Sequence, residues 1–124
     1  MANNYIKPGE HLTFTADVSI TFGNPMLSGG VVLLGTLLGV ALTTIADNTN
    51  GEAAVEGVWR LPKKNGQVIN AWSKPIWSLS EAAFVNKDAA AGDLINSCIA
   101  VETAGASART VKVKLLPGAG RVQT

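Results

Sequence analysis

The sequence contains little of what most catalytic and metal-binding sites are built from. Its 124 residues include one histidine, His11, and one cysteine, Cys98. A single cysteine excludes an internal disulfide framework, and without a cluster of histidines and cysteines a zinc-type site has no ligand set. His11 has no serine or cysteine nucleophile at a recognisable spacing, so we expect it to be a surface residue. We therefore expect no catalytic residue, no metal and no cofactor.

The chain also lacks a basic block and a phosphate-binding motif. Ten Lys and Arg residues stand against nine Asp and Glu, which gives a formal net charge of +1. Nucleic-acid binding usually depends on a basic stripe, so we expect no direct nucleic-acid contact. The carboxylates are scattered, and no pair has a spacing that suggests acid–base catalysis. No lysine directly follows a glycine, which excludes the P-loop and ATP-driven activity with it.

Charged residues are absent from residues 18–46, a window long enough for a membrane helix of about 20 residues. Turn signals at 23–25 (GNP) and 28–30 (SGG) divide this window into apolar runs of four to eight residues, which are strand lengths. We therefore predict core strands and no membrane association. The N-terminus has no basic segment leading into an apolar one, so we expect no signal peptide. The predicted strands span residues 31–34 and 37–42, joined at Gly35 and Thr36.

Other segments alternate between apolar and polar residues, as strands with one buried face do. The alternation covers residues 12–22, 55–61 and 110–116, with Leu61, Val111 and Val113 among the residues expected inside. Only residues 81–96, which are rich in alanine, could be helical, and we expect at most a short helical turn there. Turns are predicted at residues 47–51, 63–66 and 103–107.

Residues 39–62 and 98–117 resemble each other. Each has an apolar strand, a small-residue turn, an alternating strand and then Leu-Pro. Two such hairpins packed face to face would form a sandwich or a small barrel, although shared hairpin patterning explains the likeness as well as duplication does. The predicted fold is all-β: a small antiparallel β-sandwich or barrel with at most one short helix. We expect an extended N-terminal arm (1–10), a single β domain (11–117) and an extended C-terminal tail (118–124).

The order of several motifs resembles the small capsid cement, or decoration, proteins of tailed bacteriophages. The resemblance runs from about Asn3 to Leu116, and its most specific part is "GVALT" followed by "EGVWRLPK". Members of the family typically have Gly-Val-Ala in a second hairpin, where this chain has Ser97, Cys98, Ile99 and Ala100. The remaining motifs are "NYIKPGEHLTFTA", "GNPMLSGG", "AWSKPIW", "LINSCIAVETA" and "VKVKL".

The resemblance implies a structural virion protein. Such a protein catalyses nothing. It binds the outer surface of the phage head, which is assembled in the host cytoplasm, and holds major capsid protein subunits together against the pressure of packaged DNA. Two alternatives stay open: a phage DNA-binding or recombination accessory protein, since similar proteins have been labelled recombinases, and a β-sandwich binding module unrelated to virions.

The expected partners are the major capsid protein and further copies of this chain. We expect a homotrimer on the shell, because a pseudo-three-fold junction offers three equal sites, and a dimer at two-fold positions is the alternative. The tryptophans lack a flanking basic groove, so they are interpreted as core or interface anchors and not as base-stacking platforms. The candidate interaction residues are Asn3, Asn4, Tyr5, Ile6, Trp72 and Trp77.

Overall fold

The computed structural model describes residues 10–16, 29–86 and 89–124, and these residues form strands, turns and loops but no helix. The all-β prediction is confirmed. The strands are β1 (His11–Thr15), β2 (Val31–Leu34), β3 (Leu37–Ala41), β4 (Asn50–Ala54), β5 (Val58–Pro62), β6 (Ile76–Ser78), β7 (Ala83–Val85), β8 (Leu94–Ile95), β9 (Cys98–Ala100), β10 (Thr110–Leu115) and β11 (Arg121–Val122).

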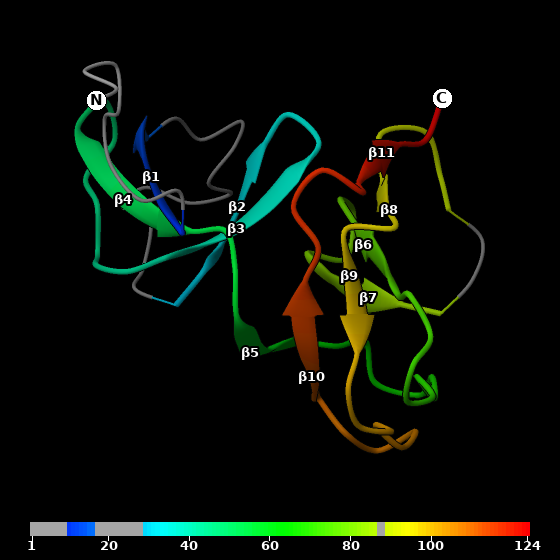
Figure 1. The fold of residues 1–124 in the computed structure, drawn as a ribbon. Coiled ribbons are helices and arrows are strands. Elements are labelled where there is room, and N and C mark those ends of the chain that lie inside the picture. Colours follow the sequence, from blue (N-terminus) through cyan, green and yellow to red (C-terminus); the bar gives the residue numbers. More distant parts are fainter. Residues whose placement is uncertain (1–9, 17–28, 87–88) are drawn as a thin grey trace, which may run out of the picture.

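The strands form three antiparallel sheets (Figure 1). One has the order β1-β4-β3-β2, the second β5-β10-β9 and the third β11-β8-β6-β7. None of them closes into a barrel, so the arrangement is that of a small sandwich. No helix forms in the described part of residues 81–96, which holds β7 and β8, in agreement with the expectation of at most a short helical turn. All three residues of β7 are buried, and this strand pairs with β6, so tertiary packing overrides the helical preference of the alanines.

The uncharged segment forms the predicted hairpin. β2 and β3 pair from Val31↔Val40 to Leu34↔Leu37, and Gly35 takes a φ of 66° in the turn between them. That conformation favours glycine because it has no Cβ. The hairpin is apolar on both faces because each face meets a different hydrophobic cluster, one containing Val40 and the other Val32. Among the described residues, no helix is long and apolar enough to cross a membrane.

The alternating segments place their apolar residues inside. In β10, Val111 and Val113 are buried whereas Lys114 is exposed, and in β5 Leu61 is buried between exposed neighbours. In β1, Phe14 is buried, as the alternation over residues 12–22 predicts, but residues 17–22 lie outside the described part of the chain. The main core draws on all three sheets and consists of Val31, Leu38, Val40, Leu61, Ile69, Trp77, Phe84, Leu94, Cys98, Ala100, Ala104, Val111, Val113 and Leu115.

Two sets of three strands share one arrangement. In the first module β4 lies between β1 and β3, and in the second module β10 lies between β5 and β9. In both modules the two outer strands come first in the chain and the central strand last. The burial pattern along β1 equals that along β5, with only the fourth residue buried, Phe14 in one and Leu61 in the other.

Backbone hydrogen bonds confirm this equivalence. Each module has the same three bonds flanking its strand pairs, at N···O distances of 2.8–3.2 Å. They are Val55 N to Glu10 O, Ala16 N to Thr49 O and Leu42 N to Glu52 O in the first module, and Leu115 N to Gly57 O, Lys63 N to Arg109 O and Val101 N to Lys112 O in the second.

The internal repeat is therefore real in the structure, although its predicted alignment is only half correct. The match between the first part of 39–62 and the first part of 98–117 is confirmed, since β3 and β9 occupy equivalent positions. The match between "GVWRLP" and "TVKVKLLP" is wrong. The strand equivalent to β10 is β4, whereas β5 is equivalent to β1 and pairs with β10.

The C-terminal residues lie on the body of the protein, which corrects the expected extended tail. Arg121 pairs with Ile95 and Val122 with Leu94, so that β11 forms an edge of the third sheet. Gly120 lies against the backbone oxygen of Thr36, where a Cβ would clash. The tail thus contacts the turn of the β2–β3 hairpin.

Replacing Val40 by aspartate is expected to unfold the domain. Val40 is 1% exposed in the main core, and an unpaired buried carboxylate costs several kcal/mol against a typical stability of about 5–15 kcal/mol. The measurement is urea denaturation followed by circular dichroism. Thr43→Asp, at an exposed position just beyond the same strand, is the control. Its free energy of unfolding should stay within about 0.5 kcal/mol of the wild-type value. A folded Val40→Asp protein of unchanged stability would contradict this placement of the hairpin.

Candidate interaction surface

The two tryptophans proposed as contact residues have opposite environments. Trp72 is 70% exposed, whereas Trp77 is 2% exposed and packs edge-on against Phe84, with ring centroids 5.0 Å apart. Trp77 therefore belongs to the core, and Trp72 alone of this pair is accessible to a partner. The other four candidates, Asn3, Asn4, Tyr5 and Ile6, lie outside the described residues.

Trp72 sits in a turn that is held from several sides. Ser73 donates from both its backbone N and its Oγ to Asn70 O, at 3.2 and 2.6 Å. Ala71 N donates to Thr103 Oγ1 at 3.0 Å, and Trp72 N donates to an oxygen of β9 at 2.7 Å. These bonds fix the backbone of the turn to the edge of the second sheet, so the Cα position of Trp72 is set before any partner binds.

The backbone of Trp72 is strained. Its φ is 70°, in the left-handed region, where a residue with a Cβ costs about 1–2 kcal/mol. A bulky aromatic residue is an outlier there. Nothing that the sequence alone shows indicates this conformation, because the local motif "NAWSKP" has no glycine.

Four other large apolar side chains are exposed among the described residues. A few such residues are normal on a soluble surface, and each is less exposed than Trp72. They are Val58, Val68, Leu79 and Val122, at 38–54% exposure.

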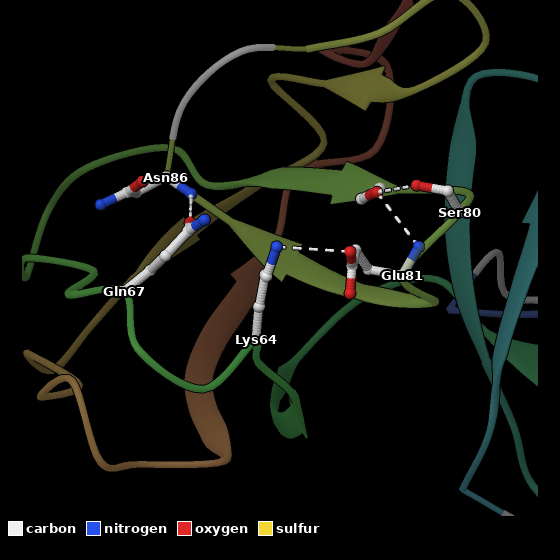
Figure 2. A network of polar contacts seen from close by, with 6 residues as sticks. Lys64, Gln67, Ser80, Glu81 and Asn86 are labelled. Carbon is white, nitrogen blue, oxygen red and sulfur yellow. Dashed lines mark hydrogen bonds and ion pairs between the residues drawn. The ribbon is translucent and has the colours of Figure 1, made fainter.

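A polar cavity of about 230 Å³ is lined by residues of β6, β7 and the loops beside them. Figure 2 shows the polar contacts among several of these residues. On the wall of the cavity, Lys64 Nζ and Glu81 Oε1 are 3.3 Å apart in a half-exposed ion pair. The Oγ atoms of Ser78 and Ser80 are 3.2 Å apart, and Glu81 N donates to Ser78 Oγ. These side chains bind one another or the backbone. We therefore interpret them as a network that stabilises the structure around the cavity.

Asp93 closes one side of the same cavity. It is 4% exposed, and its two carboxylate oxygens accept hydrogen bonds from Leu79 N at 3.0 Å and Ala90 N at 2.9 Å. A carboxylate with two amide donors holds two chain segments together. Just after the end of β7, Asn86 N donates to Oε1 of Gln67, another lining residue, at 2.8 Å and ties β7 to the loop before β6.

Lys63 is buried among backbone carbonyls. Its Nζ donates to Lys64 O at 2.8 Å and to Ala108 O at 2.9 Å, and burial lowers its pKa. In the second module Lys63 occupies the position that Ala16 has in the first, and both residues are buried. The ammonium group therefore ties the end of β5 to the loop before β10.

The single histidine and the single cysteine lie on strands of different sheets. His11 is exposed on β1, whereas Cys98 is buried on β9, where burial raises its thiol pKa to about 12. Such a thiol is a poor nucleophile at neutral pH. Among the described residues, no group of three or more His, Cys, Asp or Glu side chains is placed to hold a metal ion.

The profile of the phage cement protein family matches residues 6–115, and the chain belongs to this family. Comparisons with curated proteins and with solved structures found no match. The resemblance noted in the sequence is thereby confirmed, and the chain is a structural phage protein associated with the virion capsid.

Replacing Lys63 by methionine should destabilise the protein by about 1–2 kcal/mol, because two carbonyls lose a charged donor while the aliphatic stem is kept. The matched control is the neighbouring Lys64→Met. It removes only a half-exposed ion pair, which contributes about 0–1 kcal/mol. Urea denaturation of both variants provides the test. Equal losses would show that the Lys63 contacts add nothing.

The Cys98 thiol predicts an alkaline loss of stability. Its pKa is raised in the folded state, so its stabilising contribution is complete below the usual thiol pKa of 9.0 and is lost as the pH rises from there towards 12. Between pH 9 and 11 the unfolding free energy of the wild type should fall faster than that of Cys98→Ala, by up to about 1.4 kcal/mol per pH unit. Denaturant titrations at each pH measure both slopes. Parallel slopes would contradict the prediction.

Proposed function

We propose that this protein binds the outer surface of the expanded phage head and cements neighbouring major capsid protein subunits against the pressure of packaged DNA. The match to the phage cement protein family over residues 6–115 is the observation that carries the proposal. A protein that binds the assembled shell in preference to its dissociated subunits stabilises the shell by mass action.

The physical basis of cementing is multivalency. A single contact contributes a small free energy, but contacts made together on a lattice add up while the entropy of association is lost fewer times. This role favours a stiff body. The three sheets, the main core that they share and the docked C-terminal strand supply one.

Homotrimers at the pseudo-three-fold junctions of the shell are the proposed arrangement, and dimers at two-fold positions are the alternative. Three equal sites around such a junction suit a three-fold ligand. Strand edges and exposed apolar residues would supply the contacts between copies. In this proposal residues 1–10 act as an arm that reaches a neighbouring subunit, with Tyr5 and Ile6 as apolar anchors.

The alternative of a DNA-binding accessory protein has little support in the sequence. The net charge of +1 and the absence of a basic block do not suit phosphate contacts. Binding to DNA that weakens steeply with salt would favour this alternative over the cement function.

Heads that lack the protein should release their DNA at a lower temperature than decorated heads do. Adding the purified protein back should restore the higher temperature. DNA release is measured with an intercalating dye during heating, and bound protein by co-sedimentation with the heads. No binding to heads from its own phage would overturn the proposed function.

Reconstruction of decorated heads tests the arrangement of the copies. Density for three copies around each three-fold junction is expected, and isolated monomers or density only at two-fold axes would contradict the trimer. A protein without residues 1–8 should bind heads more weakly. Unchanged binding would contradict the role of the arm.

A further inference from the structure

Gly29 occupies in the first module the position that Trp72 occupies in the second. Gly29 N donates to Ala41 O at 2.8 Å, and Trp72 N donates to Ala100 O at 2.7 Å. Ala41 and Ala100 are equivalent residues of β3 and β9, and their own amides donate back to the residues after Gly29 and Trp72. The two φ angles are 84° and 70°. Both modules therefore have a left-handed backbone at this position. The residue there is Gly29 in the first module and Trp72 in the second.

Folding alone does not account for a tryptophan at this position. Glycine adopts the left-handed conformation without strain, as Gly29 shows. The indole of Trp72 is 70% exposed and so contributes little to the core. Strained residues persist where the surrounding structure holds them, and they gather at sites of function. Tryptophan is also prominent among the residues that dominate binding energy at protein interfaces.

The surroundings of Trp72 indicate the chemistry of the partner. Lys74 is exposed two residues further on and has no ion-pair partner among the described residues. A cavity of about 190 Å³ opens beside the turn. Its lining is mixed: Asn70, Ser73, Lys74 and Asn86 are polar, and Val68, Ile69 and Pro75 are apolar. A complementary surface would have an apolar pocket for Trp72 and carboxylates facing Lys74.

We propose that Trp72 is the anchor by which this protein docks into an apolar pocket with an acidic rim on the major capsid protein. This proposal rests on the proposed function. A second copy of the chain fits less well as the occupant, because the two cavities described above are lined mostly by polar or charged side chains. The hydrogen-bonded turn holds the backbone of Trp72 in place beforehand, so binding needs to order only the indole side chain and not the loop that carries it.

Trp72→Asn and Trp72→Gly provide the test, because both residues tolerate a left-handed backbone. Each variant should keep the melting temperature of the wild type or raise it by up to about 4 °C as the strain is removed. Each should bind heads at least about 10-fold more weakly in a co-sedimentation titration, as loss of a hot-spot residue does. Trp72→Phe should retain part of the affinity.

Matched variants separate the anchor from general surface effects. Thr110→Ser changes an exposed side chain on β10, the central strand of the same sheet, and should leave head binding unchanged. Lys74→Glu should weaken binding more than Lys114→Glu, with the difference shrinking as salt is added. Gly29→Trp has open space for its Cβ but a φ of 84°, so it should lower the melting temperature.

The outcomes distinguish this inference from the proposed function. If the wild type does not bind heads, the proposed function fails. If the wild type binds and the Trp72 variants bind equally well, the anchor fails while the cement function stands. A drop of several degrees in melting temperature for Trp72→Asn would show that the indole packs on its own chain. Dissociation of a wild-type oligomer in solution by Trp72→Asn, seen by sedimentation velocity, would reassign the contact to a second copy.

Discussion

Burial of the β2–β3 hairpin on both faces is the constraint on which the rest of the structure depends. Consecutive residues of a strand point to opposite faces, so Val31 and Val32 enter different hydrophobic clusters. The first sheet can therefore fold only if other elements cover both its faces. The strands of the second and third sheets cover one face, which explains why the main core draws residues from all three sheets and unites them in one body.

The strands were predictable where a short-range pattern determines them. Turn signals and alternation locate the hairpin at Gly35 and the inward residues of β5 and β10, because these features depend on neighbours in the chain. The short strands β7 and β8 were missed. Each has only two or three residues, too few for an alternating pattern to show, although β7 pairs with β6 across a short turn. Their alanine-rich surroundings favour a helix locally.

The candidate site was predictable only in part. Sequence singles out Trp72 and Trp77 equally, since neither has neighbours that reveal burial, and only the fold separates an exposed indole from a core one. The left-handed backbone at Trp72 has no local signal either. The comparison with Gly29 explains this conformation. The segments around Gly29 and Trp72 differ in sequence, yet each makes the same pair of hydrogen bonds to an alanine, Ala41 in the first module and Ala100 in the second. The strand alignment of the modules was missed for the same reason.

The docked C-terminal strand has a consequence for any peptide fused after it. β11 pairs with β8, Gln123 N donates to Asp93 O at 2.8 Å, and Gly120 abuts the turn of the β2–β3 hairpin. A peptide fused after Thr124 would thus emerge one residue beyond a hydrogen-bonded position. Its reach would be set by its own linker length and not by a swinging tail. Every copy of such a fusion would share one starting point for its linker, next to the edge of the third sheet.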